Sequence, residues 1–249
     1  MKVNIAKSNV IHFRPKSKNR TETDFLYNNE RLELVSQYKY LGVVFDEFLD
    51  YTITAGILAN SAGRALGSIY NKFKQNKGLG YTTSRKLYDS CVTPIFDYCT
   101  GVWGYNKLEK IDTIQNKAIR LYLGVHGYAP NKAINADMGW VSCRVRRHVQ
   151  MLRLVNMNDS KIARRIFDWD KEHRGWCINV KDILMSVDSI DYFHSNRPID
   201  LESAKRILYF NECQSWKEEV HNVPKLRTYI LNKDQYGTEA YTFIINQIA

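Results

Sequence analysis

The sequence has few features of an exported, membrane-spanning or metal-binding chain. Its 249 residues include five cysteines, an odd number with no C-x-x-C pair. This pattern is typical of reduced thiols in an intracellular protein. No segment approaches the roughly 18 apolar residues of a membrane-spanning helix, and the N-terminal segment lacks the apolar core of a secretory signal. We therefore expect an intracellular protein, in the cytoplasm or the nucleus, with no membrane partner.

Motifs of self-contained enzymes are also missing. The chain contains no P-loop, no G-x-G-x-x-G and no G-x-S-x-G, so a small-molecule substrate has no support. Asp168 and Asp170 in FDWDKEH could belong to a nuclease, but a two-metal site needs further converging acids. Structural zinc is usually held by four ligands in two tight pairs. The candidate zinc ligands are loosely spaced: Cys143, His148, His173 and Cys177. The simpler interpretation is that the two cysteines are buried thiols and the two histidines are surface imidazoles.

Basic charge is the most informative feature that is present. The net charge is +10, and it is unevenly distributed. Residues 1–20 contain six Lys or Arg and no acid, and residues 51–88 again contain six and no acid. Residues 144–174 contain nine basic and four acidic side chains. Clustered cations favour a polyanionic partner, because each neutralised phosphate releases a counterion.

The first fifty residues favour a small antiparallel β element. Residues 10–14 are a strand candidate, and residues 25–35 have the pattern of a hairpin with Asn28-Asn29 where positive φ is needed. Residues 38–45 then predict a third, continuous strand, on which Tyr38 and Tyr40 share one face. Its Gly42 has no side chain and permits another backbone to come close.

After Asp50 the apolar residues take helical spacing. One long amphipathic helix is predicted from Ile53 to Phe73. Further helices are expected over residues 82–95, with a break at Pro94, and over 107–123, 140–157, 161–168, 180–187 and 201–220. The predicted fold class is α+β, mainly α. It consists of an N-terminal β element over residues 1–50, a helical segment over 51–127 and a second helical region over 128–249.

Several short motifs follow one another in an informative order. Residues 4–13, NIAKSNVIHF, have the form N-x-x-K-[ST]-x-V-x-x-F, and residues 38–46, YKYLGVVFD, the form [FY]-K-Y-L-G-[VI]-x-[FL]-D. An R-A-L-G core follows at residues 64–67, and K-L-Y-x-x-x-V-x-P-I-x-x-Y at residues 86–98. The last three are Q-x-[RK]-A-[IL]-R-x-x-L-G at 115–124, G-W-[LV]-x-x-x-x-R-R at 139–147 and P-K-L-R-T-Y at 224–229.

In this order the motifs resemble the back half of a reverse transcriptase from a non-LTR (LINE-type) retrotransposon, over essentially the whole chain. The resemblance implies a palm edge and primer grip over residues 1–50, a thumb over 51–127 and a post-thumb region over 128–249. The primer grip would be Tyr38, Lys39, Tyr40, Leu41 and Gly42, and Lys7 would lie on the pyrophosphate side. The residues expected to contact the nucleic-acid backbone are Arg64, Lys72, Lys74, Lys117, Arg120, Arg146 and Arg147.

The palm aspartate loop of that family should precede Asn4, and these 249 residues do not contain it. Without converging carboxylates nothing holds the two Mg²⁺ ions of nucleotidyl transfer, so we expect no cofactor on this chain and Mg²⁺ only in the full-length polymerase. The function expected is a fragment of an RNA-directed DNA polymerase that binds RNA template, DNA primer and their hybrid, without activity alone. The alternative is a non-catalytic helical interaction protein or an unconstrained retroelement remnant.

Overall fold

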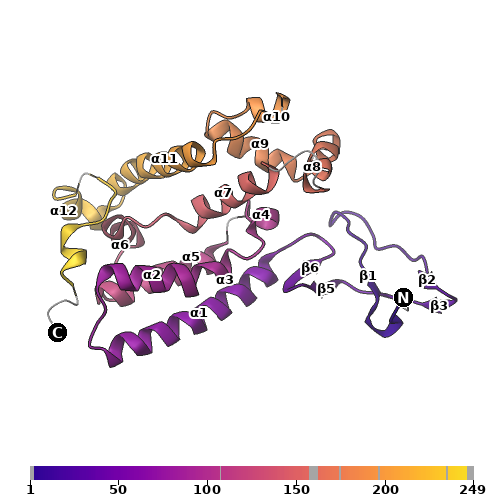
Figure 1. Ribbon diagram of the computed structural model, residues 1–249, viewed down its shortest axis with the longest axis horizontal. Helices are drawn as coiled ribbons and strands as arrows, with labels where there is room; N and C mark the ends of the chain where they lie inside the picture. The colour runs from indigo at the N-terminus through magenta and orange to yellow at the C-terminus, as the bar shows by residue number, and fades with distance from the viewer. Residues whose placement is uncertain are drawn as a thin grey trace. The chain divides into compact units, whose positions relative to one another are not determined.

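The computed structural model describes residues 3–106, 108–156, 162–173, 175–195, 197–233 and 235–245. The chain divides into two compact units, Met1–Leu58 and Ala59–Ala249, which we call the N-terminal unit and the helical unit. All the described strands lie in the first unit, and most helices lie in the second (Figure 1). The predicted fold class, α+β and mainly α with a small N-terminal strand element, is confirmed.

The first hairpin of the N-terminal unit forms where the sequence predicts it. Strand β2 (Leu26–Tyr27) pairs antiparallel with β3 (Glu30–Arg31). The turn between them has φ of 49° at Asn28 and 63° at Asn29. Asparagine tolerates this left-handed region better than most residues, because its short side chain can hydrogen-bond locally. The Asn-Asn pair therefore determines the position of this turn.

The prediction of one continuous strand from Tyr38 to Phe45 is wrong, because the segment folds back on itself. Strand β5 (Gln37–Tyr40) pairs antiparallel with β6 (Val43–Asp46), with Tyr38 opposite Phe45. The two turn residues, Leu41 and Gly42, have φ of 46° and 87°. Positive φ at both positions defines a type I′ hairpin turn. Gly42 is thus required for the turn and not for the approach of another backbone.

A parallel ladder also departs from the antiparallel element that was predicted. Strand β1 (Asn9–Val10) pairs with β4 (Glu33–Leu34) in parallel register. It follows the 3₁₀ helix η1 (Ile5–Lys7). The β6 strand supplies the buried Val43 and Val44. The Thr54 hydroxyl accepts a hydrogen bond from the Val44 amide at 2.8 Å and donates one to the Val44 carbonyl at 3.0 Å.

Helix α1 (Thr52–Gln75) begins in the N-terminal unit and continues into the helical unit, as the apolar spacing predicts. The remaining helices belong to the helical unit. They are α2 (Tyr81–Cys91), α3 (Thr93–Phe96), α4 (Thr100–Trp103), α5 (Glu109–Leu123), α6 (Asn131–Met138), α7 (Cys143–Val155), α8 (Ile162–His173), α9 (Cys177–Ser186), α10 (Asp191–Ser195), α11 (Leu201–His221) and α12 (Arg227–Ile230), with the 3₁₀ helices η2 (Pro224–Leu226) and η3 (Ala240–Phe243). Positions 107, 157 and 161, at the ends of predicted helices, lie outside the described residues.

Helix α7 is central to the helical unit. It packs against α4 on one side and against α11 on another, and α11 runs alongside it in Figure 1. Its Val149, Leu152 and Val155 join Leu184 of α9 and Leu208 of α11 in one buried cluster. Helix α7 is buried on several faces and exposes little surface, although four of its thirteen residues are arginine.

The C-terminal segment returns to the middle of the helical unit. The Tyr122 hydroxyl donates to the Thr242 carbonyl at 2.7 Å, and the Tyr236 hydroxyl donates to the Trp140 carbonyl at 3.0 Å. Gly139 ends α6 with φ of 59°, and a Cβ there would lie 2.5 Å from the Thr238 nitrogen. The chain therefore requires glycine at this position for two independent reasons.

Candidate nucleic-acid interface

The exposed side of α1 carries basic side chains and no acid, together with the exposed Ile53 and Ile57. The 24 residues of this helix include no acid, and Arg64, Lys72 and Lys74 are all exposed. At about 100° per residue, Arg64 lies in the middle of the exposed face, with Lys72 and Lys74 about 80° to either side. The Lys74 ammonium lies 4.8 Å from the centre of the Tyr70 ring, and the Arg64 guanidinium donates to the Ser61 hydroxyl at 2.9 Å. Three cations are thus presented to solvent by one rigid element.

Helix α5 adds a fourth exposed cation beside this face. A Cβ on Gly63 of α1 would lie 3.5 Å from Cδ1 of Ile114 on α5, so the two helices approach closely there. Lys117 follows Ile114 by three residues and precedes Leu121 by four, which places it on the same side of α5. Its side chain is exposed. We call Arg64, Lys72, Lys74 and Lys117 the basic surface.

Arg120 was predicted to bind phosphate, but the structure gives its guanidinium internal partners. It donates to the Ala129 carbonyl at 2.8 Å and to the Asn131 carboxamide oxygen at 2.5 Å. Arg120 therefore connects α5 to the start of α6. Lys77, which was not among the predicted residues, lines a hollow with Lys74 at the ends of α1 and α5. The same acid-free run of sequence contains it, so the signal was present.

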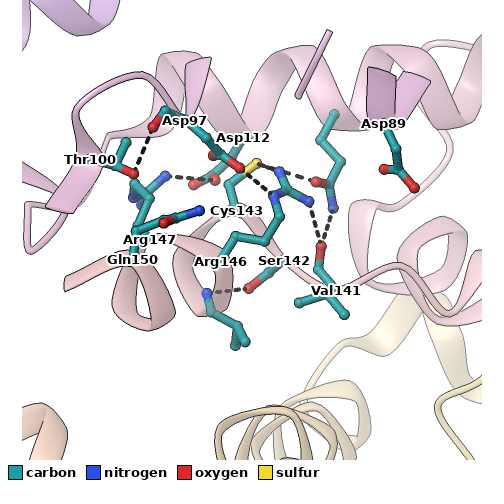
Figure 2. Close-up of polar contacts among 12 residues, drawn as sticks. Asp89, Asp97, Thr100, Asp112, Val141, Ser142, Cys143, Arg146, Arg147 and Gln150 are labelled. Carbon is teal, nitrogen blue, oxygen red and sulfur yellow. Dashed lines mark hydrogen bonds and ion pairs between the residues drawn. The ribbon is translucent and has the colours of Figure 1, made fainter. Parts of the chain in front are cut away.

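The structure corrects the prediction that Arg146 and Arg147 contact the nucleic-acid backbone, because neither guanidinium is available to a phosphate (Figure 2). The Arg146 guanidinium donates to Asp97 at 3.1 Å and to the Val141 carbonyl at 3.0 Å. Arg147 is 1% exposed and donates to the Gly104 carbonyl at 3.3 Å. The other end of its guanidinium lies 3.8 Å from Asp112.

The physical reason is that α7 is buried on more than one face. The sequence shows an apolar stripe through Val145 and Val149, which indicates one buried face. Cys143, Arg147 and Met151 form a second stripe at four-residue spacing, and all three are buried. A lone arginine between cysteine and methionine at this spacing is the signal that could have indicated a buried guanidinium.

Burial also determines the chemistry of this network. The pKa of the Asp97 carboxyl is raised because it is buried, although Arg146 beside it acts in the opposite direction. Burial raises the pKa of the Cys143 thiol to about 12. The thiol donates to the Gln115 carboxamide at 3.2 Å. A thiol in this state is a poor nucleophile and a poor metal ligand at neutral pH.

The predicted primer-grip residues lie on the β5–β6 hairpin. Tyr40 is 58% exposed and Leu41 is 72% exposed, and Lys39 and Gly42 are exposed as well. The Tyr38 hydroxyl donates to the Lys7 carbonyl at 3.3 Å, so the structure brings these two predicted positions together. The Lys7 side chain is exposed. These side chains are therefore open to a partner and are not part of a core.

The acidic candidates have other partners. Asp168 pairs with Arg164 at 3.0 Å and with Lys171 at 3.1 Å. Although partial burial raises the pKa of the Asp168 carboxyl, hydrogen bonds from Lys171 and Arg164 outweigh that effect and hold it below its usual value. Asp170 accepts the Cys177 amide at 2.6 Å and so caps α9. These contacts favour structural roles for both carboxylates.

The four zinc candidates are dispersed in the same way. The His173 ring stacks on Trp169 with centroids 3.8 Å apart, and the Cys177 thiol donates to the Asp170 carbonyl at 3.1 Å. Across the part of the chain that the structure describes, no three His, Cys, Asp or Glu side chains are grouped to hold a metal ion.

Comparison with known protein families, with curated proteins and with solved structures found no match for this chain. Among the described helices, none is both long and apolar enough to cross a bilayer.

Proposed function

We propose that the chain is part of the RNA-directed DNA polymerase of a non-LTR retrotransposon and that it binds the primer–template hybrid. The observation that carries the proposal is the basic surface, four exposed cations on two packed helices with no acid in α1. Such a surface suits a sugar-phosphate backbone, because contacts with phosphates give affinity without reading sequence. The order of the sequence motifs supports the assignment to the non-LTR retrotransposon family.

The N-terminal unit supports the proposal through the exposed β5–β6 hairpin. In the family, the matching strand holds the 3′ end of the primer. Tyr38, Tyr40 and Lys39 all lie on this hairpin, and none of the three side chains is buried. Aromatic rings can stack on bases without sequence preference. We assign no nucleotidyl transfer to these 249 residues, since Asp168 and Asp170 have structural partners.

Binding of a fluorescent RNA–DNA hybrid, measured by anisotropy at several salt concentrations, tests the proposal. The affinity is expected to fall steeply as salt rises. The double variant Lys74→Ala/Lys117→Ala should weaken binding to all sequences and lower the slope of log K against log salt by about 2.

The matched control is Lys205→Ala/Lys217→Ala, which removes two exposed lysines from α11. It changes the net charge equally and should leave the affinity nearly unchanged. A hybrid affinity that does not respond to salt, or an equal loss in both double variants, contradicts the proposal.

One observation favours the alternative of a helical interaction protein. Ile162, Ile166 and Trp169 on α8 are exposed at helical spacing, and Trp169 is 60% exposed. Exposed apolar side chains grouped on one face often mark a protein-binding surface. The two functions are separated by the same measurement, because an interaction protein without a nucleic-acid role does not bind the hybrid at moderate salt.

A further inference from the structure

A polar cleft opens between α5, α6, α7 and α11 in the helical unit. Its volume is about 540 Å³, within the range of roughly 300–1,000 Å³ that is common for small-ligand sites. Five of its lining side chains are carboxamides from three different helices: Gln115 and Asn116 of α5, Asn131 and Asn135 of α6, and Asn211 of α11. A convergence of carboxamides from separate elements is unusual on a surface that serves only solubility.

Three of the carboxamides that line the cleft have unused hydrogen-bonding capacity. Asn135 donates to the Asn116 side-chain oxygen at 2.6 Å and to the Asn131 carbonyl at 2.8 Å. Asn211 donates to the Ser186 carbonyl at 2.9 Å. Among the described residues, the Asn116 amide and the side-chain oxygens of Asn135 and Asn211 have no protein partner. Polar groups that line a cavity require such partners from water or from a ligand.

Three acids and two cations line the cleft, and one of the cations is Arg144. The three acids have partners in the protein: Glu212 accepts from Ser142 at 2.8 Å, Glu219 pairs with Lys132 at 2.8 Å, and Asp112 lies 3.8 Å from Arg147. Arg144 lines the cleft, is exposed, and has no ion-pair partner within the described parts of the chain. Its charge acts on Glu212 and Glu219 of the same cleft, and its exposed planar guanidinium can contact a phosphate with two donors.

We propose that this cleft binds one nucleotide of single-stranded nucleic acid, with the carboxamides on the base edge and Arg144 on the phosphate. A carboxamide carries a donor and an acceptor side by side and so pairs with a base edge through two hydrogen bonds. Bases of single-stranded segments are accessible for such contacts, whereas those in a duplex are not. The inference rests on the proposed nucleic-acid function and adds a site for a strand outside the hybrid.

The position of the cleft agrees with that role. Asn116 is the immediate neighbour of Lys117, so α5 contributes to the cleft and to the basic surface at adjacent positions. The Arg120 guanidinium donates to the Asn131 side chain and so fixes the first residue of α6. A strand that leaves the basic surface can therefore reach the cleft along one helix.

The test is calorimetric titration of the full chain with each of the four ribonucleoside 5′-monophosphates and with inorganic phosphate. At least one monophosphate is expected to bind with one-to-one stoichiometry and at least tenfold more tightly than phosphate. Asn116→Ala should weaken it roughly fivefold or more, as expected for the loss of a base-edge contact, and Arg144→Ala should weaken it similarly. Thr113→Ala and Lys205→Ala, exposed positions on α5 and α11 outside the cleft, are the controls.

Hydrogen exchange of the unmutated chain gives a readout that does not depend on the folding of variants. Added nucleotide should protect the amides of α6, where Asn131 and Asn135 lie. Absence of binding by all four nucleotides, equal affinity for phosphate, or no effect of Asn116→Ala overturns the inference. Hybrid binding is measured on the same preparation. A chain that binds hybrid but no monophosphate loses only the cleft, whereas a chain that binds neither loses the proposed function as well.

Discussion

The two units of this chain differ in how deeply they bury arginine: Arg147 of the helical unit is 1% exposed, whereas the side chain of Arg14, the arginine paired with the buried Glu47 in the N-terminal unit, is 13% exposed. The helical unit buries charge. Arg147 is almost inaccessible to solvent, and Arg146, also on α7, forms an ion pair with Asp97. The N-terminal unit instead displays tyrosines and lysines on short hairpins such as β5–β6. Buried networks fix helix positions, because an unpaired buried group is costly. Exposed hairpins of this kind are marginally stable alone. Charge count alone therefore does not distinguish a binding arginine from a structural one.

The largest effect that this comparison predicts follows from removing the buried arginine. Arg147→Ala should lower the free energy of unfolding of the helical unit by about 3 kcal/mol, because it leaves a cavity and removes the hydrogen bond to the Gly104 carbonyl. Urea unfolding followed by circular dichroism measures it. Arg144→Ala, three residues earlier on the same helix and exposed, should change stability by about 0.5 kcal/mol or less. Equal effects of the two variants would remove the distinction between buried and exposed arginines on α7.

The second effect concerns the pH dependence of stability in the helical unit. The pKa of His148 falls from 6.5 to about 4, because the ring is largely buried and lies near Arg144 and Arg147. Below pH 6.5 the unfolded chain therefore binds a proton that the folded chain does not. The contribution of His148 to the free energy of unfolding therefore keeps its full value above pH 6.5. It falls by roughly 2–3 kcal/mol as the pH falls towards 4.

The His148 contribution is isolated by comparing unfolding of the wild type with that of His148→Gln over the same pH range. The difference between the two free energies should shrink as the pH falls, since carboxylates titrate alike in both proteins. A difference that stays constant with pH would show that folding does not change the pKa of His148.

The smallest effect tests the N-terminal unit. Leu41 holds φ of 46° in the β5–β6 turn, a conformation that asparagine adopts more readily. Leu41→Asn should therefore stabilise the hairpin by about 0.5–1 kcal/mol. Hydrogen exchange of the β6 amides measures it, and amides of α7 serve as the internal reference. Gly42→Ala should have the opposite sign, since alanine is strained at φ of 87°.

Much of the fold follows from the sequence, and the parts that do not have identifiable causes. The spacing from Ile53 to Phe73 predicts α1, and Asn28-Asn29 marks the first turn correctly. The β5–β6 turn was missed because Leu41 is an unusual turn residue with apolar neighbours on both sides. Short helices such as α4 (Thr100–Trp103) have too few residues to show a period.

The candidate site, like the fold, was predicted from the sequence only in part. Exposed cations on α1 and Lys117 could be chosen from helical spacing, because those helices have one polar side. The burial of Arg147 had one local signal, the spacing of Cys143, Arg147 and Met151, whereas the partners of Arg146 depend on tertiary contacts that no local pattern shows. The cleft was also missed. Its carboxamides come from three helices, and no local pattern brings Asn116 close to Asn211.

The most direct test of the account is lysine acetylation footprinting with and without an RNA–DNA hybrid, quantified by mass spectrometry. If the exposed cations of α1 and α5 bind phosphates, the hybrid protects Lys72, Lys74 and Lys117 and leaves Lys205 and Lys217 reactive. Equal protection at all five lysines, or none at the first three, would contradict it.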